Sequence, residues 1–397
     1  MTDFLIGRQP IFDRNLDVFG YELLFRSLNT GPQANGTVIT QQLIVDAILE
    51  LGLEKLTGRA RAFINFTADN VLTGAAALLP SDRVVVEILE DAKVTADLIC
   101  AVRRLADQGY RIALDDFVFD PRWEPMLQIA HIVKLDVRAQ EESQLKRAID
   151  RLKAYGVQIL LEKIETEAEF QLYHSQGGDY FQGYFLSSPQ MVAGRRLGAS
   201  QQAILQILSV LHTTADLHQV AELIRRDVAL SYKLLNFINS AYFALPEHID
   251  SIEQTVILLG LESIKRWVSL LMLSTEGQKR PKELIQISLI RARMCEQLAS
   301  ASNKADPNQA FLVGLFSNLD ALLAMPLPEV LKTLPLAPEV QAGLHQQGPL
   351  GEILCCALNY ERWQLARTCC AGLPLSAIGR IYLDSLAWAQ QIYASLY

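Results

Sequence analysis

Two adjacent aspartates follow an apolar stretch in the sequence GYRIALDDFVFD, which runs from Gly109 to Asp120. The residues before Asp115 and Asp116 have the pattern of a buried strand, so both carboxylates would stand at its end. At an effective dielectric of about 20, two anions ~4 Å apart repel by roughly 4 kcal/mol. A chain with this arrangement needs a compensating cation. The pair is therefore either a solvated turn or one part of a metal site.

Polar side chains stand in the same way on most other strand-like stretches of the first half of the chain. They are Glu22 in YELLFR, Asn65 in FINFT, Glu87 and Glu90 in VEILE, Lys134 and Asp136 in IVKLD, Glu162 and Glu165 in LEKIE, and Gln182 in YFQGY. Most lie near the carboxyl end of their strand, and in a βα barrel those ends converge on one mouth. Carboxylates and an amide oxygen together suit Mg²⁺ or Mn²⁺. Two such ions can activate a water and hold both oxygens of an in-line displacement at phosphorus.

Each of these residues also has a simpler interpretation when it is taken alone. A single acid such as Glu90 or Glu165 is more often a helix cap or a solvated turn residue. Lys134 can equally form a salt bridge to a neighbouring strand. The repetition of an acid or amide on strand after strand favours a shared site. Because successive strand residues face opposite sides, Asp115 and Asp116 both reach the mouth only if the chain bends there.

The elements that must position these residues alternate between short β-rich stretches and amphipathic helical patterns. Strands are predicted at DVFGYELLF, RAFINFT, VVVEILE, YRIALDD, HIVKLDV, VQILLEKI and YFQGYFL, and the opening FLIGRQPIF is predicted to form an antiparallel hairpin through DRNLD. The later strands recur about every 20 to 27 residues, which is the rhythm of a parallel βα sheet. Eight strands predict a closed, TIM-like (β/α) barrel. At ~197 residues this barrel is at the lower limit for the fold, so some outer helices are expected to be short or missing.

The remainder of the chain shows helical periodicity alone, interrupted by proline and glycine in ALPEH, RPKE, LPLAPE, QQGPLG and AGLPLS. We therefore predict two domains, an α/β barrel over residues 1–197 and an all-α domain over residues 200–397. The runs VILLGL and SLLML are expected to belong to the core of the second domain.

Composition limits the classes of partner that the protein can bind and the cellular compartment in which we expect it. The 397 residues carry a formal charge of −8, which argues against broad binding to a nucleic acid polymer or to an anionic membrane. No apolar run approaches the ~20 residues that cross a bilayer, and the start MTDFLIGRQP has no apolar secretory core. We expect a cytoplasmic protein whose six cysteines are reduced thiols.

Taken in order, the motifs YELLFR, FINFT, VEILE, LDDF, VKLD, LEKIE and FQGYFLSSP resemble those of the EAL-domain family, phosphodiesterases that hydrolyse cyclic dimeric GMP. The resemblance covers most of residues 4 to 190, with Leu23 in place of the alanine of the Glu-Ala-Leu signature. The stretch from Leu223 to Val268, which includes LIRRDVAL, NSAYF and LLGLESIKRWV, resembles the HDOD domain, a relative of metal-dependent HD phosphohydrolases. Together the two halves resemble the EAL–HDOD signalling proteins of bacteria.

The EAL resemblance implies a role for each polar residue of the barrel. The ligands implied for two ions of Mg²⁺ or Mn²⁺ are Glu22, Asn65, Glu87, Asp115, Asp116 and Glu162, with Gln182 completing the shell. The catalytic residues implied are Lys134, which would orient or polarise the attacking water, Glu162 as its base partner, and Asp116. Arg26 and Asp136 would contact the phosphate and the nucleotide, while Glu90 and Glu165 would position the loop after Asp116. The reaction implied is hydrolysis of one phosphodiester bond to give a linear dinucleotide.

The sequence departs from the EAL pattern at two places. The family continues Asp-Asp-Phe with Gly-x-Gly, whereas VFDP follows here, and valine and phenylalanine avoid backbone conformations that are open to glycine. The family motif Glu-Gly-Val-Glu reads EKIE, which places the new cation Lys163 beside the pocket. The intact ligand set favours a phosphodiesterase. The glycine-free loop favours an alternative, a weak or inactive cyclic di-GMP receptor or scaffold that signals through the HDOD half. A third alternative, a lyase with Lys134 as a Schiff-base nucleophile, is opposed by the surrounding acids, which would hold the amine charged.

The helical half lacks the ligands of an HD hydrolase. None of its histidines is followed by aspartate, and Ser317 and Asn318 stand in GLFSNLDALL where a relative would have its His-Asp pair. We therefore expect no metal and no hydrolase activity in residues 200–397, which would instead bind an unidentified protein partner. Formation of a homodimer stays open.

Overall fold

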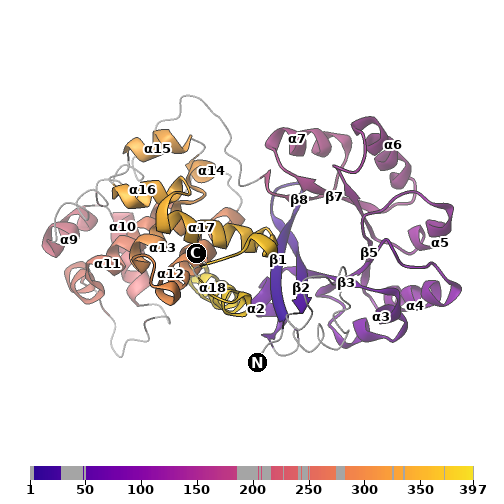
Figure 1. Cartoon of the computed structure of the whole chain (residues 1–397), viewed down its shortest axis with the longest axis horizontal. Coiled ribbons are helices and arrows are strands. Elements are labelled where there is room, and N and C mark those ends of the chain that lie inside the picture. The colour runs from indigo at the N-terminus through magenta and orange to yellow at the C-terminus, as the bar shows by residue number, and fades with distance from the viewer. Residues whose placement is uncertain are drawn as a thin grey trace. The chain divides into compact units, whose positions relative to one another are not determined.

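The computed structural model describes residues 4–27, 48, 51–185, 204, 207, 216–226, 228–239, 243, 249, 251–273, 282–323, 326–333, 336–370 and 372–396. The chain divides into two compact units, Met1–Ser188 and Pro189–Tyr397, and each unit is described by itself (Figure 1). The predicted boundary between residues 197 and 200 lies outside the described residues and stays a prediction.

The first unit is a closed barrel whose eight strands follow one another in sequence order. The strands are β1 (Phe4–Asp13), β2 (Val18–Ser27), β3 (Arg61–Phe66), β4 (Val84–Ile88), β5 (Arg111–Leu114), β6 (Ile132–Asp136), β7 (Gln158–Ile164) and β8 (Tyr180–Gly183). Strands β2 to β8 pair in parallel, and β1 is antiparallel to both β2 and β8. This confirms the predicted TIM-like barrel and its opening hairpin.

Asp13 builds the turn of that hairpin. Its side chain accepts hydrogen bonds from the backbone N–H groups of Asn15 and Asp17, at 2.8 and 3.0 Å. Leu16 completes the turn with a left-handed φ of 64°. Aspartate favours such turns because its short side chain bonds to the backbone two residues further on. The sequence DRNLD therefore reverses the chain, and β1 runs against the other seven strands.

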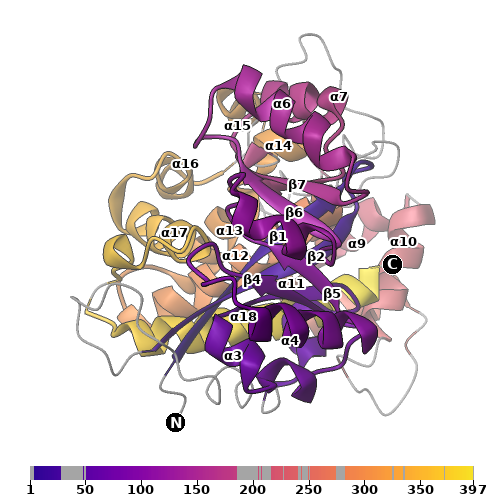
Figure 2. The same ribbon diagram turned by 90° about the vertical axis from the view of Figure 1, so that its right-hand side faces the viewer.

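Helices of unequal length cover the outer face of the barrel (Figure 2). The longer ones are α4 (Ala96–Asp107), α6 (Glu142–Lys153) and α7 (Glu167–Gln176), and the short ones are α2 (Leu53–Thr57), α3 (Ala68–Leu72), α5 (Glu124–Leu127), η1 (Ala75–Leu78) and η2 (Pro121–Trp123). Thr95 and Thr166 begin α4 and α7 by capping the first turn with their hydroxyl groups. The prediction of shortened outer helices is confirmed. One of the amphipathic helical patterns between the strands, TVITQQLIVDAILELGL, lies mostly outside the described residues.

A layer of inward-facing side chains crosses the barrel below its mouth. Its members are Ile11, Phe63, Val85, Ala113, Ile132, Leu160 and Tyr180. Strand β2 contributes Gly20, which pairs with Ile11, and a Cβ at this position would lie 2.7 Å from the Phe63 ring. Every strand thus supplies one member. Because strand residues two apart face the same side, this layer fixes which residues point into the barrel nearer the mouth.

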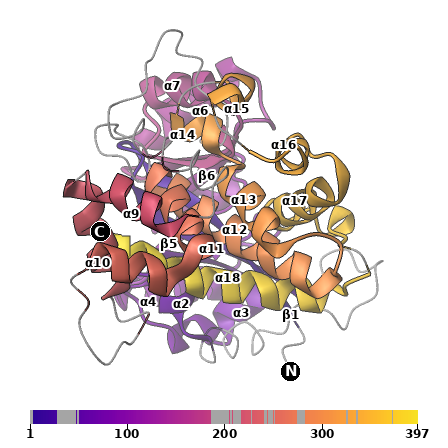
Figure 3. The same ribbon diagram turned by 90° about the vertical axis from the view of Figure 1, so that its left-hand side faces the viewer.

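Within its described residues, the second unit contains helices and no strand, as predicted (Figure 3). The helices are α9 (Leu217–Arg225), α10 (Val228–Ile238), α11 (Ile252–Leu273), α12 (Lys282–Ser302), α13 (Pro307–Phe316), α14 (Leu319–Leu323), α15 (Leu327–Thr333), α16 (Pro338–Leu344), α17 (Gly348–Glu361), η4 (Leu365–Arg367) and α18 (Leu375–Leu396). Helices α12 and α13 approach closely, since a Cβ on Gly314 would lie 2.3 Å from the backbone oxygen of Arg291. No helix in the described parts of the chain is both long and apolar enough to cross a membrane.

Helix α11 corrects one expectation about the core. Ile257 and Leu258, in the run VILLGL, are 55% and 56% exposed, so the prediction that this run is buried is wrong for these two residues. Val256 beside them is fully buried. The helix breaks at Gly260, whose φ of 72° and ψ of 169° are not helical. Successive residues of a helix point about 100° apart, so Val256 faces the core while Ile257 and Leu258 lie on another face of the same helix.

Candidate active site at the barrel mouth

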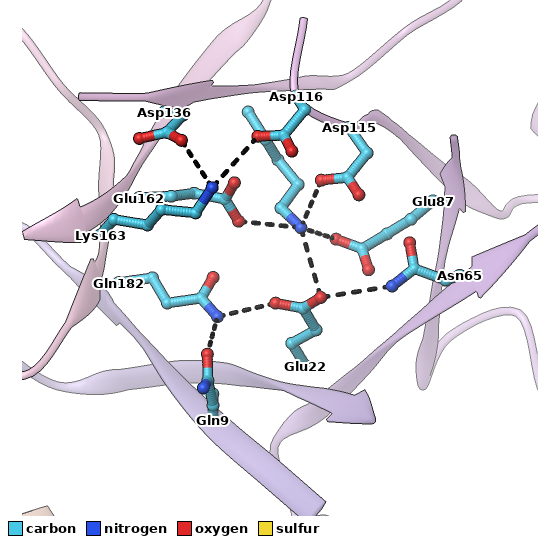
Figure 4. A network of polar contacts seen from close by, with 11 residues as sticks. Gln9, Glu22, Asn65, Glu87, Asp115, Asp116, Asp136, Glu162, Lys163 and Gln182 are labelled. Carbon is cyan, nitrogen blue, oxygen red and sulfur yellow. Dashed lines mark hydrogen bonds and ion pairs between the residues drawn. The ribbon is translucent and has the colours of Figure 1, made fainter. Parts of the chain in front are cut away.

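Polar side chains occupy the inward-facing positions two residues above the apolar layer on all eight strands. Counting two residues toward the mouth from each member of that layer gives Gln9, Glu22, Asn65, Glu87, Asp115, Lys134, Glu162 and Gln182. The barrel therefore brings all eight into one pocket, where they contact one another (Figure 4). The predicted convergence of polar residues from successive strands is present in the structure.

Lys134 lies at the centre of this pocket. Its ammonium nitrogen is 2.7 Å from Asp115 Oδ1, 2.8 Å from Glu87 Oε1, 2.9 Å from Glu162 Oε1 and 3.6 Å from Glu22 Oε1. The Lys134 side chain is only 1% exposed. Four carboxylates thus share one cation, and the side chain expected to polarise the attacking water also holds the acidic residues together.

Three amides complete the ring around the carboxylates. Asn65 Nδ2 donates to Glu22 Oε1 at 3.3 Å, and Gln182 Nε2 donates to Glu22 Oε2 at 2.7 Å. Gln182 Nε2 also donates to Gln9 Oε1 at 3.0 Å. Both oxygens of Glu22 are therefore held in place, while the amide oxygens of Asn65 and Gln182 have no hydrogen-bond partner in the part of the chain that the structure describes.

The paired aspartates separate because the chain bends between them. Asp115 points to Lys134, whereas Asp116 has a left-handed φ of 37° and turns toward the outer rim of the mouth. The backbone N–H of Asp115 donates to Ile88 O, and that of Phe117 donates to Lys134 O, so neighbouring strands fix both sides of the bend. The bend that the sequence required is present, and each aspartate meets its own lysine.

Lys163 is the second cation of the mouth. Its ammonium lies 2.5 Å from Asp136 Oδ2 and 3.9 Å from Asp116 Oδ1 (Figure 4). Lys163 has a left-handed φ of 62° and lies where the pairing of β7 with β8 shifts register, between Leu161 and Ile164. The irregularity in β7 directs the Lys163 side chain to the same pocket rim as Asp116.

The electrostatics of the pocket follow from burial and from these ion pairs. Burial opposes the charge on Lys134, but the surrounding carboxylates, led by Glu22, hold its pKa well above the usual value. Burial raises the pKa of Glu87 well above the usual value against the opposing effect of Lys134. Burial also raises the pKa of Glu162, to about 8. Because Lys134 stays charged, it is a poor Schiff-base nucleophile, which argues against the lyase alternative.

Three residues with predicted roles lie outside this ring of contacts. Arg26 is exposed on β2, opposite Leu5. Glu90 lies in an exposed turn after β4 and forms no hydrogen bond or ion pair with a described residue. Glu165 is exposed and lies 3.5 Å from the guanidinium of Arg138. Their predicted roles with phosphate and loop remain predictions.

The sequence interpretation missed Gln9. Its signal is its position two residues before Ile11 in GRQPIF, which places both side chains on the same face of β1. Because β1 is antiparallel to its neighbours, the mouth-facing residue precedes the buried one in this strand, whereas it follows the buried one in the other seven.

The pocket offers oxygen atoms of the kind that a divalent cation uses. Asn65 Oδ1, Gln182 Oε1, Glu87 Oε2 and Asp116 Oδ1 are buried and have no hydrogen-bond partner among the described residues. Buried polar atoms are normally paired, and hard oxygen donors suit Mg²⁺ or Mn²⁺. Among the described residues, no three histidine, cysteine, aspartate or glutamate side chains are spaced to hold a metal ion. In this pocket Lys134 lies between the carboxylates and keeps them apart. The donor set fits a divalent cation, which the carboxylates would turn from Lys134 to bind.

In the helical unit, a buried arginine contacts Ser317 and Asn318, the residues expected to stand where a relative has its His-Asp pair. Arg291 Nη1 donates to Ser317 Oγ at 3.1 Å and to Asn318 Oδ1 at 2.6 Å, and Arg291 Nε donates to Glu361 Oε2 at 2.8 Å. A guanidinium, a hydroxyl, an amide and one carboxylate thus form a local polar network in this unit.

The chain matches two known domain families. The EAL domain family matches residues 4–189, and the HDOD domain family matches residues 197–338. The protein named cyclic di-GMP phosphodiesterase CdgJ, from Vibrio cholerae serotype O1, is 36% identical over 399 residues, which are 98% of this chain and 92% of that protein. The uncharacterized protein YuxH of Bacillus subtilis is 33% identical over 401 residues, 98% of each chain. A solved structure of BlrP1 from Klebsiella pneumoniae with calcium and cyclic di-GMP is 19% identical, over 46% of this chain and 54% of that chain, with a TM-score of 0.38.

Proposed function

The chain belongs to the family of proteins that join an EAL domain to an HDOD domain, and from that premise we propose that it is a metal-dependent phosphodiesterase that hydrolyses cyclic di-GMP to a linear dinucleotide. The polar layer at the mouth of the barrel supports this activity most strongly, because every strand contributes one side chain to it. The full-length match to a protein named as a cyclic di-GMP phosphodiesterase supports the same substrate.

Oxygen donors around the pocket would hold the divalent ions, Mg²⁺ or Mn²⁺, with two bound at full occupancy. The proposed ligands are Glu22, Asn65, Glu87, Asp115, Asp116, Glu162 and Gln182. When bound, such ions lower the pKa of a water and neutralise charge that develops on the phosphate. The buried amide oxygens of Asn65 and Gln182, which have no hydrogen-bond partner among the described residues, support this assignment.

The residues around Lys134 would carry the proton and charge changes of hydrolysis. Lys134 Nζ donates a hydrogen bond to the attacking water, and Glu162 accepts the proton that this water loses. The water oxygen forms a bond to phosphorus while the bond from phosphorus to one ring oxygen breaks. The leaving oxygen takes a proton from solvent water, and Glu162 returns its proton to solvent. Asp116 assists at the rim, Arg26 would contact a phosphate of the substrate, and Asp136 would help to hold the nucleotide.

The loop after Asp116 is packed through contacts that need no glycine. The rings of Phe117 and Phe119 pack edge to face with centroids 5.2 Å apart, and the guanidinium of Arg151 lies 4.0 Å over Phe119. Asp120 then caps the 3-10 segment η2 through the backbone N–H of Arg122. The loop therefore has a defined path built from aromatic contacts. Glu90 and Glu165, on neighbouring loops, are proposed to position it.

Further properties of the chain follow as proposals from the same premise. We infer a barrel domain over residues 1–197 and a helical domain over residues 200–397 that binds no metal and relays the signal to a protein partner. The Arg291 network supports the absence of metal, because a guanidinium fills the place beside Ser317 and Asn318. We also propose that the protein works in the cytoplasm and is able to form a homodimer.

Turnover of cyclic di-GMP by the full-length chain tests this function. With Mn²⁺ or Mg²⁺ present, we expect chromatography to show the linear dinucleotide, and we expect Glu22→Ala to reduce the rate to below about one hundredth. Glu54→Ala is the matched control, because Glu54 is an exposed acid on α2 of the same barrel. Tight binding of cyclic di-GMP without hydrolysis, in the presence of either metal, would favour the receptor function over the phosphodiesterase. An equal loss in Glu54→Ala would show that the Glu22 effect is not specific to the site.

A further inference from the structure

Lys163 occupies a backbone position that suits a different residue. Its φ of 62° lies in the left-handed region, which glycine enters freely and lysine does not. The irregularity in β7 requires this conformation, because the pairing with β8 resumes only at Ile164 and Gly183. A lysine here strains the backbone without filling any cavity, since its side chain is 54% exposed. The strain therefore has to be explained by what the ammonium group contacts.

The ammonium of Lys163 is held at the rim of the pocket by two aspartates. Asp136 Oδ2 lies 2.5 Å away, and Asp136 is itself fixed because its Oδ1 accepts the backbone N–H of Arg138 at 2.7 Å. Asp116 Oδ1 lies 3.9 Å from the same ammonium and is buried without a hydrogen-bond partner among the described residues. Asp116 is the one acidic proposed ligand among the described residues that is not paired with Lys134. Its carboxylate thus already faces a positive charge that Asp136 holds in place.

We propose that Lys163 is a built-in cation that takes the place of a second divalent ion, so that the mouth binds one ion tightly and a second one weakly. This inference rests on the proposed function, because it takes the mouth to be a metal site. The tight ion would use the oxygens of Glu22, Asn65, Glu87 and Asp115, because the three carboxylates among them outweigh the single positive charge of Lys134. An ion that uses Asp116 would lie near the ammonium of Lys163. It would either displace that ammonium or be repelled by it.

Coulomb's law gives the order of magnitude of the effect. Charges of +2 and +1 about 6 Å apart in a water-like dielectric repel enough to weaken binding by about tenfold. Partial burial of the mouth strengthens this repulsion, and the Asp136 carboxylate, 2.5 Å from the ammonium, offsets part of it. We therefore expect the second Mn²⁺ ion to bind about tenfold more weakly than it would without the lysine.

Three variants separate charge from backbone strain. Lys163→Gly and Lys163→Asn both remove the charge and suit a left-handed φ, whereas Lys163→Arg keeps both the charge and the strain. The number of Mn²⁺ ions bound to the full-length chain is measured by calorimetry and by the loss of the free Mn²⁺ signal in electron paramagnetic resonance. These readouts need no turnover. Circular dichroism and hydrogen exchange over β7 verify that each variant is folded.

The wild-type chain and Lys163→Arg are expected to bind one tight Mn²⁺, while Lys163→Gly and Lys163→Asn gain a second site about tenfold tighter than before. Two equally tight ions in the wild type, or no gain in the two uncharged variants, would overturn the role of Lys163 and leave the phosphodiesterase proposal standing. A third outcome is one tight ion in the wild type and a second site in the uncharged variants, but no hydrolysis of cyclic di-GMP. This outcome would overturn the phosphodiesterase proposal and support the role of Lys163.

Discussion

Removal of the Lys134 ammonium is expected to destabilise the metal-free barrel strongly. Lys134 is 1% exposed and has four carboxylates within 3.6 Å of its ammonium nitrogen. Two of these acids, Glu87 and Glu162, are themselves buried, with 0% and 7% of their surface exposed. Breaking a buried ion pair by removing one partner costs about 3–5 kcal/mol, because the remaining charge is left uncompensated. We therefore expect Lys134→Met to lower the free energy of unfolding of the barrel by about 3–5 kcal/mol at pH 7 in EDTA.

The measurement has to report on the barrel separately from the helical unit. Pulsed hydrogen exchange across a urea series, followed on peptides from β6 and β7, gives the unfolding midpoint of the barrel in the full-length chain. Lys146→Met is the control, because Lys146 is an exposed lysine on α6 of the same unit. Mn²⁺ is expected to recover part of the loss in Lys134→Met, since a divalent ion supplies the missing positive charge to the same carboxylates.

Two results would refute this reasoning. If Lys134→Met in EDTA matches Lys146→Met within about 0.5 kcal/mol, the ammonium does not hold the acidic residues together. If the loss at pH 7 persists unchanged at a pH where the carboxylates are protonated, it does not arise from uncompensated charge, because neutral carboxyl groups need no cation.

Two further predictions concern pH and the loop after Asp116. Burial raises the pKa of Glu162 from 4.5 to about 8, so between these values the folded metal-free chain holds a proton that the unfolded chain has lost. Urea unfolding in EDTA is expected to show stability falling by a few kcal/mol as the pH rises from about 5 to 8, and saturating Mn²⁺ should flatten that slope; stability that rises over this interval would contradict the shift. Phe119→Ala removes an edge-to-face ring contact and a cation–π contact with Arg151, so we expect a loss of about 1–2 kcal/mol and faster hydrogen exchange at residues 117–123. Exchange that stays at the wild-type rate would show that these contacts do not order the loop.

Strand periodicity made most of the barrel and its pocket predictable from sequence. Each mouth-facing residue stands two positions from a buried apolar one, as Asn65 does from Phe63 and Glu87 does from Val85. That rule needs only the alternation of side chains along a strand. It failed for Gln9 because the direction of β1 reverses the order of the polar and apolar positions.

Other features depended on contacts that sequence does not contain. The sequence indicated that Lys134 either pairs with a neighbouring strand or acts in catalysis, and the structure shows that it binds four acids from four strands. The exposure of Ile257 and Leu258 also escaped prediction, because a continuous apolar run in a helix does not show by itself which of its residues face the core. The sequence shows that Arg26 is a cation and Glu90 an acid near the end of a strand, but it does not show that both side chains are exposed outside the central ring of contacts.

The reversed direction of β1 decides which side of the barrel an N-terminal attachment would meet. Phe4 pairs with Ser27 at the carboxyl end of β2, so the first described residue lies on the same side of the barrel as the proposed active site. In a barrel whose first strand ran with the others, a tag joined ahead of that strand would emerge at the closed floor. Here a bulky fluorescent protein or affinity resin attached at this end starts beside the entrance, and a binding assay built on it risks obstructing the ligand that it is meant to detect.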